Sequence, residues 1–298
     1  MSYRPAVAAA GGGQPTEGVT MIVVVGGTGR VGRQVAAQLR ERDLPVRVVT
    51  RGLNPAGAAP GAEVARADLA DPASLETHLL GAQALFLVWP FTSPEMTAGL
   101  APKVAEIAAR HAARIVYLSA QPAADQPGSF WALVERAIEG SGASWTFLRP
   151  TGFAANTLMW ADQIRSGDVV QWPFGAAARA LIDERDIAAV AVRALADNGH
   201  DGARYLLSGP AVLTQAEQLA AIGQAIGRDL RWEELPRQAA LKTLAAAWGD
   251  PAFAETALDA WQWFVDHPET VTSAVQDVTG TPARSFADWA AANAAAFR

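Results

Sequence analysis

The chain has 298 residues, of which half are apolar, 24 are Lys or Arg and 30 are Asp or Glu. It contains no cysteine, which excludes disulfides, thiolate catalysis and cysteine-based zinc sites. The formal net charge of −6 argues against a nucleic-acid partner, and no apolar run is long enough to cross a membrane. Because no charged segment and apolar core of a secretory signal are present, we expect a cytoplasmic protein.

The chain begins with a segment that has no hydrophobic periodicity. Residues 1–19 are rich in alanine and glycine, which predicts a disordered tail. Residues 21–25 (MIVVV) are apolar and mostly β-branched, which predicts a buried parallel strand. Glycines at 26, 29 and 32 follow directly, and the next predicted element is a helix over residues 30–42.

The order strand, glycine turn, helix is typical of a dinucleotide-binding site. Glycines permit the tight turn and let the backbone approach the pyrophosphate, while the helix N-terminus supplies free N–H groups. The spacing is Gly-x-x-Gly-x-x-Gly rather than the commoner Gly-x-Gly-x-x-Gly, so the prediction depends on the strand and the helix around it. The cofactor contacts expected from this turn are Gly26, Thr28, Gly29, Arg30, Val31 and Gly32.

The end of the second predicted strand, residues 44–50, bears on the choice of cofactor. Sites that prefer NAD carry an acidic residue near this point, which binds the ribose 2′-hydroxyl. Residues 45–53 contain no acid; Arg51 ends the strand, and Arg30 lies in the glycine turn. Because two guanidinium groups suit a 2′-phosphate, we expect NADP(H) rather than NAD(H). The alternative is that both arginines are ordinary solvated residues.

Strands and helices then alternate along the chain. The further predicted strands are 63–67, 84–89, 114–118 and 144–148, and the helices are one capped by Asp71 with Pro72 at its first position, 94–113 and 128–139. This alternation predicts an α/β fold, a doubly wound parallel sheet that forms a Rossmann domain over residues 20–153. Such sheets bind ligands at the carboxyl ends of their strands. These ends add the expected cofactor contacts Asp68, Leu69, Trp89, Pro90, Ser119, Pro150 and Phe153.

The regular alternation fades in the second half. Helices are predicted at 154–166, 184–197, 214–226, 237–248, 251–264 and 285–297, and short strands near 169–171, 180–182 and 204–208. We therefore expect residues 154–298 to form a smaller, mainly helical substrate-binding cap on the sheet.

The assembled motifs resemble those of the NmrA-like, atypical branch of the short-chain dehydrogenase/reductase superfamily. They are GGTGRVG, VVTR, ADL, YLSA, SGASWTFLRPTGF with Asn156, IDERDIA at 182–188 and YLLSGP at 205–210. The resemblance covers about residues 21–298. It implies a protein that binds NADP(H) or NAD(H). Some members resemble quinone or imine reductases and others resemble redox sensors, so the family narrows the fold more than the activity.

The catalytic pair of typical short-chain dehydrogenases is missing. These enzymes use a Tyr-x-x-x-Lys pair on one helix face, in which the Tyr acts as the acid. The residues four positions after Tyr3, Tyr117 and Tyr205 are Val, Gln and Gly. The equivalent helix starts with the largely apolar sequence FWALVE at residues 130–135. This argues against an alcohol dehydrogenase or sugar epimerase, but it leaves hydride transfer to an acceptor that solvent could protonate.

Other polar residues give weaker signals. The four histidines are scattered, and we interpret them as surface or helix-end residues without metal-ligand spacing. Ser119 follows a buried strand and could either contact the substrate or cap the next loop. The charged run 183–186 opens a predicted helix, where we expect an N-cap and surface residues. No catalytic residue is identified, and no metal site is expected.

Aromatic residues suggest an apolar substrate pocket. The expected pocket residues are Trp89, Trp131, Phe153, Asn156, Trp160 and Trp172. Four later tryptophans, Trp248, Trp261, Trp263 and Trp289, are interpreted as core. We expect an NADPH-dependent reductase of a small hydrophobic molecule, aromatic or not, such as a quinone, an imine or iminium, or an activated double bond. Two alternatives are a cofactor-binding redox sensor without turnover and a non-redox isomerase or cyclase.

Overall fold

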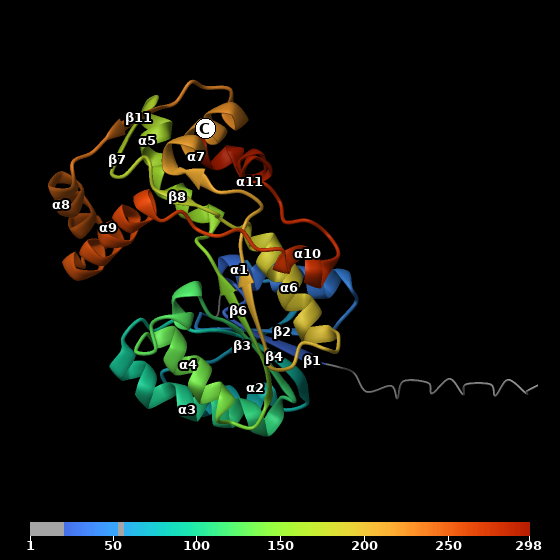
Figure 1. The fold of residues 1–298 in the computed structure, drawn as a ribbon. Helices are drawn as coiled ribbons and strands as arrows, with labels where there is room; N and C mark the ends of the chain where they lie inside the picture. The colour runs from blue at the N-terminus through green and yellow to red at the C-terminus, as the bar shows by residue number, and fades with distance from the viewer. Residues whose placement is uncertain (1–20, 53–56) are drawn as a thin grey trace, which may run out of the picture.

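The computed structural model describes residues 21–52 and 57–298. The expected disordered tail, residues 1–19, therefore lies outside the described residues. Two parts are visible in Figure 1, a sheet flanked by helices and a cap at one end of it, with the C-terminus in the cap.

A parallel sheet forms the larger part of the molecule. Its order is β3-β2-β1-β4-β5-β6-β9, and every pairing is parallel. The strands are β1 (Met21–Val25), β2 (Val46–Thr50), β3 (Glu63–Arg66), β4 (Ala82–Val88), β5 (Arg114–Leu118), β6 (Ser144–Pro150) and β9 (Ala203–Leu207). The predicted α/β fold with a doubly wound parallel sheet is confirmed.

Helices cover both faces of this sheet because alternate strand residues are buried on opposite sides. Ile22 and Val24 of β1 pack toward one layer, whereas Val23 and Val25 pack toward the other. The first layer is α1 (Arg30–Glu41), α6 (Glu184–Ala196) and α10 (Ala274–Thr279); the second is α2 (Ala73–Leu79), α3 (Pro94–His111) and α4 (Phe130–Glu139). Figure 1 shows the two groups on opposite sides of the strands.

The cap has its own apolar core and two small sheets, which pair β8 with β10 and β7 with β11. Its elements are η2 (Ala154–Trp160), α5 (Ala161–Ser166), β7 (Val169–Trp172), β8 (Ala178–Arg179), β10 (Leu213–Thr214), α7 (Gln215–Ile226), β11 (Arg231–Glu234), α8 (Arg237–Trp248), α9 (Pro251–Asp266), α11 (Phe286–Ala292) and η3 (Ala294–Phe297). A further short helix, η1 (Gln121–Ala124), follows β5.

The chain returns to the sheet after the cap has begun. The helix α6 packs on α1, and β9 extends the sheet beyond β6. The sequence predicted that the Rossmann domain ends at residue 153, so α6 and β9 were expected in the cap rather than on the sheet. The short elements η1, β10, β11 and α10 were not predicted. The expected N-cap at Asp71 is wrong: α2 begins at Ala73, and no side chain caps it.

Candidate active site

The glycine turn between β1 and α1 has a backbone that side chains would disturb. Gly26 has a φ of 79°, and its N–H donates to the carbonyl of Val49 at 3.1 Å. A Cβ on Gly32 would lie 2.3 Å from the carbonyl oxygen of Gly26, so glycine is needed for α1 to pack on the turn. A Cβ on Gly29 would meet only that same oxygen, at 3.2 Å, and Gly29 is exposed. The space beside Gly29 is therefore open to a ligand.

The N-terminus of α1 is not closed by a side chain. Gly29 is the N-cap, and the first turn contains no acidic residue. By contrast, capping boxes of Thr214 with Glu217 and of Ser285 with Asp288 close α7 and α11. The first N–H groups of a helix have no partner within the helix, and the partial positive charge there suits phosphate. The turn thus fits the pyrophosphate of a dinucleotide.

The carboxyl ends of the parallel strands bring the other predicted cofactor residues to the same edge of the sheet. These residues are Arg51, Asp68, Leu69, Trp89, Pro90, Ser119, Pro150 and Phe153. The hydroxyl oxygens of Thr28 and Thr50 lie 3.5 Å apart, which places the turn against the end of β2. Trp89 is buried, and its indole N–H donates to Thr97 at 3.0 Å. The contacts of these residues with a cofactor stay predictions.

The two arginines expected to bind a 2′-phosphate are both exposed. Arg51 directly follows β2, where an arginine accommodates the phosphate in dinucleotide-binding folds. Arg30 instead lines a cavity of about 230 Å³ on the cap side, together with Arg33 and Arg185. Arg51 is thus the better placed of the two, and their joint action stays a prediction.

A buried polar network joins the ends of β5 and β6 to α4. The hydroxyl of Ser119 donates to Glu135 at 2.5 Å, and Arg149 donates twice to the same carboxylate, at 3.0 and 2.6 Å. Ser119 and Glu135 are each only 3% exposed. The hydrogen bond and charge of Glu135 raise the pKa of Arg149. Since the serine proton is directed to Glu135, what the Ser119 oxygen can offer a ligand is an acceptor lone pair.

The sequence reasoning missed Glu135. It is four positions after Trp131, so Trp131 and Glu135 stand at the spacing of the Tyr-x-x-x-Lys pair on the equivalent helix. The available signal was that Glu135 is the first charged residue after the five apolar residues that open α4. The nearby Tyr117 is fully buried, and its hydroxyl has no hydrogen-bond partner among residues 21–52 and 57–298. Burial and the neighbouring charge of Glu135 raise its pKa well above the usual range, so Tyr117 stays protonated.

The expected substrate-pocket residues fall into two groups. Asn156 and Trp160 line a cavity of about 60 Å³ in the cap with Trp261, and Trp172 packs against Trp261 with ring centroids 5.5 Å apart. Phe153, at the base of the cap, forms an isolated parallel β-bridge with Ile182. The structure thus adds Trp261 to this group.

The other two residues of the expected pocket lie on the sheet side. Trp89 packs edge-on against Phe91, and Trp131 packs against Phe130 with centroids 4.0 Å apart. Within residues 21–52 and 57–298, no aromatic contact joins Trp89 or Trp131 to the cap group. A single enclosure by all six residues stays a prediction.

The interpretation of the four late tryptophans as core is wrong for Trp263. Its side chain is 59% exposed on the outer face of α9, where it stacks on His267. Trp289 is 2% exposed and belongs to the cap core, and Trp248 and Trp261 pack against it partly buried.

The charged run 183–186 is not a surface run. Asp183 caps α6 as expected, since its carboxylate accepts from the N–H of Arg185 at 2.8 Å. However, Asp183, Glu184 and Asp186 are buried. Glu184 accepts from Ala155 N–H and from the Trp289 indole, at 3.0 and 3.1 Å. This run joins the cap to the sheet, because Glu184 opens α6 on the sheet and both of its partners lie in the cap.

Residues 21–52 and 57–298 contain no group of three or more His, Asp or Glu side chains arranged to hold a metal ion. In the same residues, no helix combines the length and the apolar character needed to span a bilayer.

A doubly wound parallel sheet with an open glycine turn at its carboxyl edge defines a dinucleotide-binding protein of the Rossmann class. The comparisons narrow this class. The model of the NmrA-like family matches residues 19–278, and the chain belongs to this family.

Two curated relatives match nearly the whole chain. The (4-alkanoyl-5-oxo-2,5-dihydrofuran-3-yl)methyl phosphate reductase of Streptomyces griseus is 38% identical, over 93% of this chain and 99% of the relative. The NAD(P)H azoreductase of Xenophilus azovorans is 34% identical, with the same coverage. Both are named reductases, which confirms the predicted class of enzyme, an NAD(P)H-dependent oxidoreductase.

The fold has solved counterparts. The structure of an Escherichia coli NADPH-dependent quinone oxidoreductase, determined with NADPH, superposes with a TM-score of 0.75 at 24% identity. The match covers 91% of this chain and 99% of that chain. At this identity the likeness supports the fold alone.

Proposed function

We propose that this protein is an NADPH-dependent reductase of a small organic molecule with an electron-poor acceptor, such as a quinone, an imine or iminium, or an activated double bond. The observation that carries the proposal is the open glycine turn, whose uncapped helix N-terminus lies at the same sheet edge as the base of the cap. The two curated relatives support it, since one is named for an azo acceptor and the other for an oxo-dihydrofuran ring.

The chain's own residues supply binding and orientation. NADPH, when bound, supplies the hydride. The first turn of α1 would hold its pyrophosphate, and Arg51 its 2′-phosphate. Glu135 and Arg149 fix the Ser119 hydroxyl, which would present an acceptor lone pair at the carboxyl end of β5.

No acid of the Tyr-x-x-x-Lys type stands ready to protonate a product. Tyr117 is buried and directed into the core, and Trp131 occupies the tyrosine spacing on α4. We therefore infer that the product takes its proton from water. This suits azo, quinone and conjugated acceptors better than an isolated ketone, whose alkoxide needs an acid.

The test is NADPH oxidation with a panel of acceptors: a benzoquinone, an azo dye, a cyclic iminium ion, an unsaturated lactone and a simple ketone. We expect turnover with at least one of the first four and none with the ketone. If NADPH binds but no acceptor is reduced, the proposal is wrong and the redox-sensor alternative is favoured. Gly29→Val, which we expect to lose NADPH binding, serves as the negative control.

A further inference from the structure

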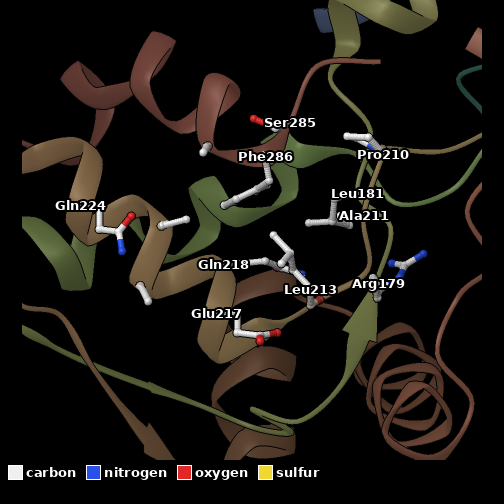
Figure 2. A pocket seen from close by; sticks show the side chains of 13 residues that line it. Arg179, Leu181, Pro210, Ala211, Leu213, Glu217, Gln218, Gln224, Ser285 and Phe286 are labelled. Atoms are coloured by element: carbon white, nitrogen blue, oxygen red, sulfur yellow. Dashed lines mark hydrogen bonds between the residues drawn. The ribbon is translucent and has the colours of Figure 1, made fainter. Parts of the chain in front are cut away.

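A cavity of about 400 Å³ lies in the cap between α7, α11 and the β8–β10 pair (Figure 2). Its volume is in the range of small-molecule sites. Most of the lining residues are apolar and several are small, including Leu181, Leu213, Ala220, Ala221, Phe286 and Ala287. Figure 2 shows Phe286 and Leu181 facing the helix α7 across this space.

Glu217, Ser285 and Gln218, three of the polar residues around the cavity, already have partners in the protein. Glu217 accepts from the N–H and the hydroxyl of Thr214, both at 2.8 Å. Ser285 donates to Asp288 at 2.6 Å, and the Gln218 amide donates to the Leu213 carbonyl at 2.9 Å. The two helices that begin here are capped, so their N-termini do not offer an anion site. The cavity therefore suits an apolar ligand group.

A second, smaller cavity adjoins the first one. It measures about 60 Å³ and shares Arg179, Leu181 and Gln218 with the larger cavity. Asn156 and Trp261 line its other side. Three side chains thus form the wall between a mainly apolar space and a space that the expected substrate residues line.

Arg179 is the charged residue of this wall, and its side chain extends toward the sheet. A Cβ on Gly152 would lie 2.6 Å from Nη1 of Arg179, so the guanidinium rests against the segment that follows β6. Its Nη2 donates to the buried Glu269 at 2.5 Å, while its Nε is buried without a partner among the described residues. In Figure 2 the guanidinium points away from Phe286 and Gln218.

We propose that the larger cavity binds an alkyl or acyl tail of the substrate, and that Arg179 donates a hydrogen bond to a carbonyl oxygen on the substrate's reactive part. This inference rests on the proposed function. Glu269 neutralises the charge of Arg179. The Nη N–H groups of Arg179 that do not bond to Glu269 therefore suit an uncharged oxygen. The favoured substrate class is then a tailed quinone or conjugated carbonyl compound.

The test measures binding of benzoquinones with no tail, a butyl tail or a decyl tail to the NADP⁺-loaded protein by calorimetry. We expect affinity to rise roughly fourfold for each methylene that becomes buried. Ala287→Phe, which fills the cavity, should remove this gain and leave the tail-less quinone unaffected. The matched control is Ala291→Phe, one turn further along α11 and outside the cavity lining, which should retain the gain.

Two further variants complete the test. Ala221→Leu fills the cavity from α7 and replaces Ala287→Phe if circular dichroism shows that variant to be unfolded. Arg179→Lys retains a charge for Glu269 but loses the planar fork, and should weaken all three quinones by the same factor.

The inference is overturned if tailed and tail-less quinones bind equally, if no quinone binds, or if both α11 variants lower the affinity alike. These readings use NADP⁺ and need no turnover. Tail-dependent binding without NADPH oxidation would instead contradict the proposed function and retain the cavity as an apolar binding site.

Discussion

The sheet and the cap are stabilised by different interactions. The sheet is buried between two apolar layers, and its central strands β1, β4 and β5 are mostly apolar. The cap has shorter strands, and buried carboxylates join its segments to one another and to the sheet part. Glu269 accepts from Arg179 and from Ala180 N–H, and Glu184 accepts from Ala155 N–H and the Trp289 indole. Particular polar partners thus add to the apolar core of the cap, whereas the central strands of the sheet depend mainly on hydrophobic patterning.

The largest expected effect separates two glycines of the same turn. Gly32→Val should destabilise the protein by about 4 kcal/mol or more, because its Cβ would collide with backbone. Gly29→Val should fold normally but lose NADPH affinity by about 100-fold, a change of roughly 3 kcal/mol. Urea unfolding and fluorescence titration measure the two quantities. Undiminished NADPH affinity in folded Gly29→Val would remove the cofactor site from this turn.

The second prediction compares an ion pair of the cap with one of the sheet. Glu269→Ala should cost about 3 kcal/mol of unfolding free energy, because Glu269 is buried and its loss leaves both Arg179 and the N–H of Ala180 without an acceptor. Glu63→Ala removes the exposed partner of Arg47 at the sheet edge and should cost about 1 kcal/mol or less. Equal losses in urea unfolding would contradict the contrast between the two regions.

The third prediction concerns the sheet side alone. Arg51→Asp should reduce or reverse the preference for NADPH over NADH, since a charge-assisted contact to phosphate is worth about 1.5–3 kcal/mol. Quinone affinity, which we assign to the cap, should not change. Dissociation constants for both cofactors and one quinone provide the measurement. A wild-type preference for NADH would show that the assignment of Arg51 is wrong.

The smallest expected effect lies where the two regions meet. Burial raises the pKa of Glu184 above its ordinary value, so the ionised carboxyl is disfavoured in the folded state. The folded protein then binds this proton more tightly than the unfolded chain, and stability should rise as the pH falls through the folded pKa. Relative to Glu184→Gln, the wild type should gain unfolding free energy between pH 7 and pH 4. A relative loss would contradict the buried position of Glu184.

Much of the sheet could be predicted because its signals are local. A run such as residues 21–25 followed by glycines specifies strand, turn and helix within twelve residues, and parallel strands bring their ends together. Family motifs then extended the prediction to the cap. The short β11 and α10 carried too little periodicity to be recognised.

The missed features depend on partners that lie far apart in the sequence. The buried Glu135 accepts hydrogen bonds from Ser119 and Arg149, and the buried Asp186 accepts one from Arg284, nearly a hundred residues later. A charged run is normally exposed, so nothing local to residues 183–186 indicated burial. The prediction for Trp263 was wrong in the opposite sense. Its apolar character predicted burial, but the side chain is exposed because it lies on the outer face of α9.

The return of the chain to the sheet has a consequence for how the molecule comes apart. The backbone passes between sheet and cap after β6, before α6, after β9, and on both sides of α10. Cutting any one of these connections leaves the others intact, so a protease nick should yield two fragments that stay associated under native conditions. Neither part is a continuous piece of chain, and residues 21–153 alone would leave the β6 edge unpaired and the α6 face of the sheet uncovered.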